Sequence, residues 1–457
     1  MKKSEYTANS PARSSRVGPA DEGAEKRRQL RRVALSSLLG TVIEYYDFLL
    51  YGTMAALVFG TLYFPSSSGA VSTIAAFGTL AAGYAARPVG GILFGHFGDK
   101  LGRKSTLIVS MTLMGAASFL IGVLPTYDRI GVLAPILLVT LRVVQGIAVG
   151  GEWGGAALMV IESAEPHRRG TWAGIMQMGS PLGALSSTAV VALVTTLPDD
   201  SFYSWGWRVP FLLSALLLAV GLYVRLSVVE SPVFREATEH APLETKRRIP
   251  ALEVLRRPRS LILACAVGIG PFALTALVSS QILAYAKGIG YESSDVVRTL
   301  LLTSGLVPLL FIPLFSALSD RLGRRPVSLL GAVGAIAFAF PLYAMVDTGS
   351  LVLLTAGLAF AQVLQAAMYA PLAPMLSEMF GTGVRYTGVS MGYQLASLIG
   401  AGFTPLIATS LVAAGDGSSR PLSILIIVGA AITLLALSRL SESRGRDLTA
   451  LISSSKV

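Results

Sequence analysis

Two near-copies of one short polar stretch determine the architecture of this chain: Gly95-His96-Phe97-Gly98-Asp99-Lys100-Leu101-Gly102-Arg103-Lys104 and Ser319-Asp320-Arg321-Leu322-Gly323-Arg324-Arg325-Pro326. Each copy lies between two long apolar runs. Asp99 and Asp320 are 221 residues apart, which is close to half of the 457 residues. A loop of Asp, Gly and clustered cations that occurs once in each half predicts a duplicated membrane bundle.

The composition supports this interpretation. The chain is 53% hydrophobic and 14% charged, with a mean hydropathy of +0.64, whereas an ordinary soluble domain has about 25% charged residues. A transmembrane helix needs about 20 apolar residues, so the chain has room for a dozen. Cys265 is the single cysteine, and the three histidines are scattered. We therefore expect no disulfide, no metal site and no cofactor.

The apolar runs predict an all-α integral membrane protein whose twelve helices form two pseudo-symmetric six-helix bundles. The predicted domains are a disordered cytoplasmic tail (1–32), an N-terminal bundle (33–227), a cytoplasmic linker (228–259), a C-terminal bundle (260–440) and a cytoplasmic tail (441–457). Within the linker, residues 249–257 have the pattern of a short amphipathic helix at the inner surface. The predicted spans are 33–60, 71–96, 105–124, 132–160, 170–196, 208–227, 260–286, 294–318, 327–346, 350–376, 384–412 and 421–440.

The distribution of positive charge gives the orientation. The net charge is +11, which by itself would be compatible with nucleic-acid binding. With both termini in the cytoplasm, however, thirty of the 37 Lys and Arg residues lie in inner segments and four in outer loops. This is the positive-inside bias of a membrane protein. We attribute the basic surplus to topology in a lipid bilayer and expect no nucleic-acid partner.

Four ionisable residues interrupt the predicted spans of the first half. Glu44 and Asp47 are three residues apart, which places both carboxylates on one helix face, with Tyr51 one turn further on. Arg87 belongs to the second span, and Arg142 to the fourth. At 1.5 Å per residue, all four lie roughly 15–21 Å from a membrane surface. A charge at this depth costs about 2.5–3.5 kcal/mol on insertion scales, which makes such residues functional candidates.

These residue types suit proton-coupled transport of an anion. A guanidinium keeps its proton and grips a carboxylate with two hydrogen bonds. A carboxylate near a cation can exchange that partner for a proton. We therefore assign substrate recognition to Arg87 and Arg142, with Gln145 and Tyr51 beside them, and proton carriage to Glu44 or Asp47. The structural alternative is that the four charges only form buried ion pairs.

Other polar residues of the spans extend this prediction. Glu152 lies on the fourth span, about 15 Å closer to the cytoplasm than Arg142. It is either a proton-coupling acid on the exit path or half of a structural ion pair. The second half contributes only neutral candidates, whose hydroxyl and amide groups suit a hydroxylated or carboxylated solute or form interhelical hydrogen bonds. The substrate-binding candidates there are Gln281, Tyr285, Gln365, Tyr369, Tyr393 and Gln394.

The inner loops predict a gate between the two halves. Asp99 and Asp320 are placed to meet the positive N-terminal end of a neighbouring helix. Glu162 and Arg169 are seven residues apart, and Glu378 and Arg385 repeat this spacing in the second half. The alternative is that these groups are loop caps without a switching role. The predicted gate residues are Asp99, Arg103, Glu162, Arg169, Asp320, Arg324, Glu378 and Arg385.

Several of these stretches resemble the major facilitator superfamily and, within it, the metabolite:H+ symporters. They include Glu44-Tyr45-Tyr46-Asp47-Phe48-Leu49-Leu50-Tyr51-Gly52, Arg87-Pro88-Val89-Gly90-Gly91 and the run from Arg142 to Gly155. Gly151-Glu152-Trp153-Gly154-Gly155, Trp205-Gly206-Trp207-Arg208 and Gly392-Tyr393-Gln394-Leu395-Ala396-Ser397 are most similar to its shikimate-transporter-type branch. The resemblance implies a cell-membrane symporter that works by alternating access.

Three functions remain open at this point. The leading one is proton-coupled uptake of a small carboxylated metabolite, shikimate-like or a di- or tricarboxylate, by a protein that functions as a monomer. The second is import of proline or betaine. The third is a drug/proton antiporter or a non-transporting membrane sensor. An enzyme is not expected, because no nucleophile–base pair, phosphate-binding loop or metal cluster is present in the sequence.

Overall fold

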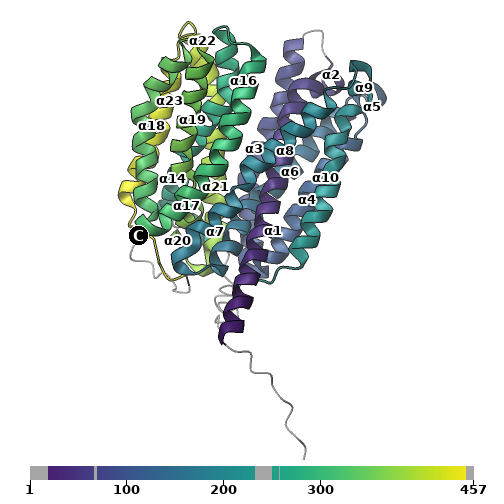
Figure 1. Ribbon diagram of the computed structural model, residues 1–457. Coiled ribbons are helices and arrows are strands. Elements are labelled where there is room, and N and C mark those ends of the chain that lie inside the picture. Colours follow the sequence, from purple (N-terminus) through teal and green to yellow (C-terminus); the bar gives the residue numbers. More distant parts are fainter. Residues whose placement is uncertain (1–18, 66–68, 232–249, 257, 449–457) are drawn as a thin grey trace, which may run out of the picture.

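The computed structural model describes residues 19–65, 69–231, 250–256 and 258–448, and this part of the chain is all-helical (Figure 1). In order, the helices are α1 (Pro19–Met54), η1 (Ala55–Phe59), α2 (Gly60–Tyr63), α3 (Gly69–Leu101), α4 (Arg103–Val123), α5 (Tyr127–Ile130), α6 (Leu133–Ser163), η2 (Pro166–Arg168), α7 (Arg169–Gln177), α8 (Gly179–Val194), α9 (Asp199–Ser204), η3 (Gly206–Arg208), α10 (Val209–Leu226), α13 (Pro250–Leu255), α14 (Pro258–Thr275), η4 (Ala276–Gln281), α15 (Ile282–Gly288), α16 (Ser293–Leu300), η5 (Leu301–Leu306), α17 (Val307–Leu322), α18 (Arg324–Val346), α19 (Leu351–Tyr369), α20 (Leu372–Met379), η6 (Thr382–Val384), α21 (Arg385–Ser397), η7 (Leu398–Phe403), α22 (Thr404–Ala414) and α23 (Arg420–Arg439).

These helices form the predicted twelve spans. Eleven of them, counting helices that continue without a break as one, are long and apolar enough to cross a membrane. The remaining long helix is α3, whose 33 residues correspond to about 50 Å. Figure 1 shows two side-by-side bundles, one running from α1 to α10 and the other from α14 to α23. The prediction of a twelve-helix membrane protein with two bundles is therefore confirmed.

The duplicated polar loops have the same backbone geometry. Gly102 between α3 and α4 has a φ of 108°, and Gly323 between α17 and α18 has a φ of 111°. Residues with a Cβ rarely adopt such angles, which explains why a glycine stands at the same place in both copies. In each loop the arginine that follows the glycine pairs with the aspartate four residues before it, Arg103 with Asp99 and Arg324 with Asp320.

The prediction of a disordered tail over residues 1–32 is wrong for its second part. Helix α1 begins at Pro19, so the first span is preceded by several helical turns that extend away from the bundle (Figure 1). Residues 19–32 are rich in Ala, Glu, Lys, Arg, Gln and Leu, which are strong helix formers. They adjoin the apolar run directly, so the helix continues into them without a new nucleation step. Residues 1–18 lie outside the described residues.

The linker and the C-terminal segment both contact the inner face. The amphipathic helix predicted over residues 249–257 is α13, and its Val254 is buried against Leu261, Val384 and Met391 of the C-terminal bundle. The backbone oxygen of Leu448 accepts hydrogen bonds from Arg385 Nη2 (2.7 Å) and Thr382 Oγ1 (2.8 Å). Residues 441–448 of the predicted tail therefore dock on the protein, whereas 232–249 and 449–457 lie outside the described residues.

Close packing of α3 against α6 sets the position of the polar residues on both helices. A Cβ added at Gly146 or Gly150 of α6 would overlap backbone atoms of α3, and one added at Gly90 of α3 would overlap the backbone of Ile147. Small residues at such contacts let two membrane helices approach closely. Arg87, about one turn before Gly90 on α3, and Gln145, next to Gly146 on α6, are thereby brought to one site.

Four spans change locally to a π-helix. The segments are η1, η4, η5 and η7, and all four lie in the outer halves of their spans. Two of them contact the opposite bundle, since η5 lies against α8 and η7 against α3. Single π-turns inside helices occur frequently at functional sites.

Candidate functional site

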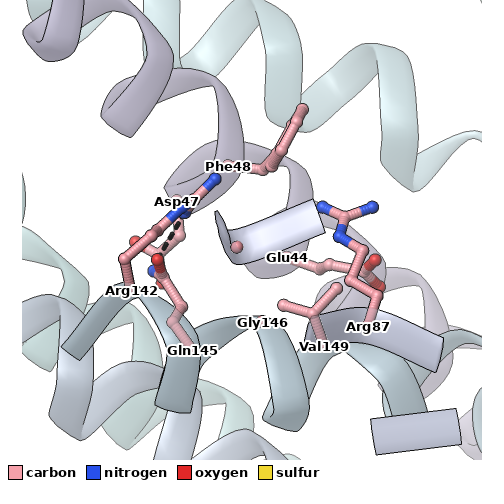
Figure 2. Close-up of a pocket in the computed structure, with 9 residues that line it drawn as sticks. Glu44, Asp47, Phe48, Arg87, Arg142, Gln145, Gly146 and Val149 are labelled. Atoms are coloured by element: carbon pink, nitrogen blue, oxygen red, sulfur yellow. Dashed lines mark hydrogen bonds between the residues drawn. The ribbon is translucent and has the colours of Figure 1, made fainter. Parts of the chain in front are cut away.

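The acids and arginines of the first half meet in one pocket (Figure 2). Its lining residues come from α1, α3 and α6, and its empty volume is about 220 Å3, including the part open to solvent. All four predicted charges are at least nine-tenths buried, with Arg87 the most exposed at 9%. The lining residues are Glu44, Asp47, Phe48, Gly83, Arg87, Arg142, Gln145, Gly146 and Val149.

Aromatic rings hold both arginines. The Arg87 guanidinium carbon lies 4.4 Å from the centroid of Phe48 and 4.6 Å from that of Tyr84. Arg142 lies 4.0 Å from the centroid of Tyr51. Across the described ranges, no carboxylate is within ion-pair distance of either guanidinium. Cation–π contacts therefore position two buried cations without neutralising them.

A chain of hydrogen bonds connects Arg142 to Asp47. Arg142 Nη1 donates to Gln145 Oε1 at 2.5 Å, and Gln145 Nε2 donates to Ser118 Oγ at 2.7 Å. Ser118 Oγ in turn donates to Asp47 Oδ2 at 2.8 Å, while Ser214 Oγ donates to Oδ1 at 2.5 Å. Both Asp47 oxygens are thus occupied, and a change at Asp47 is transmitted to the guanidinium through two neutral side chains.

Glu44 is held less firmly than Asp47. Its carboxyl group lies on the Arg87 side of the pocket (Figure 2), and Arg87 is the nearest source of positive potential. Its Oε2 atom is buried and accepts no hydrogen bond from any described residue. A buried carboxyl oxygen without a donor has a strong tendency to gain a partner, either a proton or a hydrogen-bond donor.

The structure does not bring the second-half candidates to this pocket. Tyr285 donates to Asp347 at the outer end of α18, and Gln281 accepts from Thr409. Gln394 reaches across to the backbone oxygen of Gly150 (3.2 Å). Gln365 is buried and, like the others, does not line the pocket.

Tyr369 and Tyr393 form a cluster between the bundles. Their hydroxyls lie 3.2 Å apart, and the ring of Tyr393 stacks on Trp153 of α6 with centroids 3.6 Å apart. Tyr45, next to Glu44 in the chain, lies close enough to both tyrosines to interact with them electrostatically. This Tyr45–Tyr369–Tyr393 cluster connects the helix that carries Glu44 with the C-terminal bundle.

Sequence reasoning missed several contributors to the pocket. Phe48 and Tyr84 looked like ordinary apolar positions, and Ser118 and Ser214 stood alone in apolar runs. Gly83 lies where a Cβ would be 2.6 Å from Arg142 Nε, so its absence of a side chain makes room for the guanidinium. The position of Phe48 directly after Asp47 could have predicted its role, because it places the ring beside the face of α1 that carries Glu44 and Asp47.

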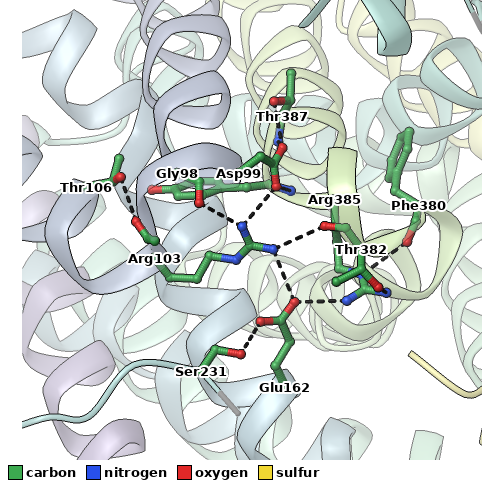
Figure 3. A network of polar contacts seen from close by, with 12 residues as sticks. Gly98, Asp99, Arg103, Thr106, Glu162, Ser231, Phe380, Thr382, Arg385 and Thr387 are labelled. Atoms are coloured by element: carbon green, nitrogen blue, oxygen red, sulfur yellow. Dashed lines mark hydrogen bonds and ion pairs between the residues drawn. The ribbon is translucent and has the colours of Figure 1, made fainter. Parts of the chain in front are cut away.

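Both duplicated loops contact the opposite bundle at the inner face, and Figure 3 shows the first of them. Asp99 Oδ1 accepts from the backbone N of Tyr386 (3.0 Å), and Oδ2 accepts from the backbone N (2.9 Å) and Oγ1 (2.8 Å) of Thr387. Asp320 makes the same three contacts with Gly170 and Thr171. As predicted, each aspartate meets the N-terminal end of a helix, α21 or α7, of the other half.

The remaining predicted gate residues form two mixed-charge clusters. Glu162 Oε1 lies 2.9 Å from Arg385 Nη1 and 3.5 Å from Arg103 Nη2 (Figure 3). Glu378 lies 3.5 Å from Arg169 Nη1 and 3.7 Å from Arg324 Nε. Arg103, Glu162, Arg324 and Glu378 are almost fully buried. These contacts join the two bundles at the cytoplasmic end, so the structure is closed on that side.

Two glutamates outside the spans were missed. Glu230 and Glu442 follow α10 and α23. They accept from the backbone N of Lys104 (3.1 Å) and Arg324 (2.9 Å), which lie in the first turns of the helices after the duplicated loops. Burial raises the pKa of Glu442, but four backbone N–H donors outweigh it and lower the pKa below its usual value. Glu442 is therefore ionised at neutral pH and caps α18 as a charged group.

Comparisons with known proteins agree with this architecture. A family model described as Major Facilitator Superfamily matches residues 37–294, and one described as Sugar (and other) transporter matches residues 272–452. The structure of the proton:xylose symporter XylE bound to 6-bromo-6-deoxy-D-glucose superposes with a TM-score of 0.75 at 18% identity. That superposition covers 93% of this chain and 98% of XylE.

Two curated relatives are similar over almost the whole chain. The shikimate transporter of Escherichia coli (strain K12) is 40% identical over 93% of this chain and 97% of its own length. The proline/betaine transporter of the same strain is 31% identical over 92% of this chain and 85% of its own length. Both relatives are transport proteins.

Proposed function

This chain belongs to the major facilitator superfamily and is a multi-pass cell-membrane transporter, and we propose that it couples uptake of a small carboxylated metabolite to the entry of protons. The observation that supports this most directly is the pair of buried guanidinium groups that have no carboxylate within ion-pair distance among the described residues. An anionic substrate supplies the missing partner, because guanidinium and carboxylate form two parallel hydrogen bonds. The shikimate transporter, at 40% identity, makes a hydroxylated ring acid the first candidate substrate.

The charge balance of the pocket supports coupling to a proton. With Glu44 and Asp47 ionised, the two acids and the two arginines sum to zero. A monocarboxylate adds one negative charge in a buried place, where an uncompensated charge is costly. Protonation of one acid restores neutrality, so we propose that one proton enters with each carboxylate group.

The two acids suit different tasks. Asp47 has both oxygens engaged by serine hydroxyls and reaches Arg142 through Gln145. We assign to it the positioning of Arg142. Glu44 has a free buried oxygen beside Arg87, so we assign proton carriage to Glu44. A substrate carboxylate that binds Arg87 weakens the attraction between Arg87 and Glu44. Glu44 then has less positive charge nearby, which favours its protonated form.

Alternating access follows from the gates described above. The inner face is closed by the Asp99 and Asp320 contacts and by the two mixed-charge clusters, so substrate reaches the pocket from outside. We propose that rocking of the two bundles then exchanges these contacts for new ones on the outer side. The Tyr45–Tyr369–Tyr393 cluster lies where it can report the state of Glu44 to the C-terminal bundle.

A second candidate is import of a zwitterion such as proline or betaine. The proline/betaine transporter is 31% identical over most of the chain, and a zwitterion also presents one carboxylate to Arg142. Its ammonium group needs an anionic or aromatic partner of its own. The rings of Phe48, Tyr51 and Tyr84 already face arginines, so only Glu44 and Asp47 remain, and such a substrate would not need a proton for charge balance.

A ligand screen separates these candidates. Purified protein is heated with shikimate, quinate, citrate, 2-oxoglutarate, proline or betaine, and the unfolding temperature is measured. At a hundredfold its dissociation constant, a ligand that binds only the folded protein stabilises it by about 2.7 kcal/mol. We expect a hydroxylated carboxylate to raise the unfolding temperature and the zwitterions to leave it unchanged. Stabilisation by proline or betaine alone would favour the second candidate.

Neutralising the two acids should give different defects. Glu44→Gln is expected to abolish pH-driven accumulation in proteoliposomes while leaving counterflow, since exchange of substrate needs no net proton movement. Asp47→Asn removes the charge and one of the two acceptor oxygens at the end of the hydrogen-bonded chain, so it should weaken substrate binding by about 1.5–3 kcal/mol, the worth of a charged hydrogen bond. Uphill accumulation that survives in Glu44→Gln would show that another group carries the proton.

A further inference from the structure

A second buried charge cluster lies inside the N-terminal bundle, apart from the substrate pocket. Arg225 Nη2 of α10 lies 2.8 Å from Glu152 Oε1 of α6, and the two side chains are 3% and 1% exposed. Ser110 Oγ of α4 donates to Glu152 Oε2 at 2.8 Å. Neither residue lines the pocket of Figure 2 or takes part in the contacts of Figure 3.

Helix α1 connects this ion pair to Glu44. A Cβ added at Gly40 would overlap Arg225 Nη2 and lie 2.7 Å from Glu152 Oε1, so the pair rests on the bare backbone of α1 at this residue. Gly40 precedes Glu44 by four residues, which is about 6 Å or one helical turn toward the cytoplasm. Both Glu152 and Arg225 act electrostatically on Glu44. The Glu152–Arg225 ion pair therefore lies next to Glu44, the proposed proton carrier, on its cytoplasmic side.

A second pocket continues from the ion pair toward the cytoplasm. Its empty volume is about 230 Å3, including the part open to solvent, and Arg225, Lys104, Ser36 and Ser37 are its polar lining residues. Within the described residues, the buried Arg225 Nε and Nη1 atoms donate no hydrogen bond. Unsatisfied guanidinium donors are costly in a protein interior, so Arg225 favours water at the part of the pocket that it lines, although Val33, Leu107, Met159 and Val228 form the rest of the lining.

We propose that Glu152 receives the proton of Glu44 and releases it to the cytoplasm through this second pocket, by a route inside the N-terminal bundle that is separate from the substrate's path between the bundles. The inference rests on the proposed proton coupling. The O–H bond of Glu44 breaks and, by way of intervening water, an O–H bond forms on Glu152. Glu152 then gives the proton to water in the second pocket and returns to the carboxylate that pairs with Arg225.

The charged and titratable groups around Glu152 come from several helices. Arg225 of α10 pairs with Glu152, and Lys104 of α4 lines the second pocket beyond Arg225. Tyr386 of α21 donates its hydroxyl hydrogen to the backbone oxygen of Gly151, the residue before Glu152. Glu44 on α1 is the acid that supplies the proton.

A double variant tests the route without leaving a buried charge unpaired. Glu152→Gln alone would strand Arg225 and endanger folding, so we choose Glu152→Gln/Arg225→Gln. In proteoliposomes we expect counterflow at the wild-type rate and pH-driven uptake slower by at least about 100-fold, the usual contribution of a positioned proton-transfer group. Undiminished pH-driven uptake would overturn the proposal and leave the pair as a structural contact. Absence of pH-driven uptake in the wild type would overturn the proposed coupling as well.

A pair of glycine variants on α1 provides a matched comparison. Gly40→Ala forces the ion pair away from α1, whereas a Cβ at Gly52 meets only Leu80 Cδ1, at an ordinary 3.7 Å. We expect Gly40→Ala to lose pH-driven uptake and keep counterflow, and Gly52→Ala to retain both. Equal pH-driven uptake in the two variants would contradict a route past Gly40.

Discussion

Arg142→Ala is expected to abolish measurable binding of the carboxylate substrate. Loss of one bidentate contact removes two charge-assisted hydrogen bonds, which at about 1.5 kcal/mol each lowers affinity by roughly 100-fold or more. The substitution also ends the hydrogen-bonded chain through Gln145 to Asp47. Substrate-induced thermal stabilisation and counterflow are the measurements.

Two further variants make the result specific. Arg142→Lys keeps the charge but loses the planar fork that faces the ring of Tyr51, so we expect binding to stay well below the wild type. Arg129→Ala removes an exposed cation on the outer side and should bind normally. Unchanged affinity in Arg142→Ala would remove this residue from the site and with it the main support for an anionic substrate.

Asp99→Asn is expected to shift the transporter toward the state open to the cytoplasm. The Asp99 carboxylate accepts three hydrogen bonds from the start of α21, and an amide retains only part of them. A loss of about 1.5–3 kcal/mol changes the ratio of inward-open to inward-closed molecules by roughly 10- to 100-fold. Asp320→Asn should have the same effect through the start of α7.

Thiol labelling can follow this shift. In a Cys265→Ser background, Ser390→Cys places a thiol on α21 at its contact with Gly154 of α6, where Ser390 is fully buried. An impermeant maleimide added from the cytoplasmic side should label it faster in Asp99→Asn than in the parent. Asp128→Asn, a change at an exposed outer residue, serves as the control. Equal labelling rates would contradict a gating role for Asp99.

The sequence predicted best those features that have a high free-energy cost, because such features occur only where they are needed. Charges in an apolar run are rare, so Glu44, Asp47, Arg87 and Arg142 were identifiable, and helical spacing sufficed to place them at one depth. The duplicated loops were equally clear, because a glycine with a positive φ must recur in both copies. These two signals led to the twelve-helix fold and to the charged half of the pocket.

What the sequence could not supply was the direction of individual side chains. Gln281, Tyr285 and Gln394 lie on spans at plausible depths, yet their partners are Thr409, Asp347 and the α6 backbone. Neutral polar residues carry little penalty in a span, so their presence does not distinguish a binding site from an interhelical hydrogen bond. Only the packing of α3 and α6 decides which faces meet.

Arg225 illustrates the same limit for a charged residue. It follows an apolar run near the inner end of its span, which made it look like one more cation of the inner surface. In the structure its side chain turns back into the bundle and pairs with Glu152. Glu152 of α6 can pair with Arg225 of α10 because Gly40 of α1 has no side chain at the contact. This contact involves three helices, so no local sequence pattern could predict it.

The π-helical segments have a consequence for the order of events in one transport cycle. A π-turn weakens the regular ladder of backbone bonds, so bending there requires less energy than in an uninterrupted α-helix. Because η1, η4, η5 and η7 all lie in the outer halves of their spans, the outer ends of these spans bend more easily than the ends that face the cytoplasm. Arriving solute should therefore first be enclosed by flexing of single helix tips, and only afterwards by movement of whole bundles.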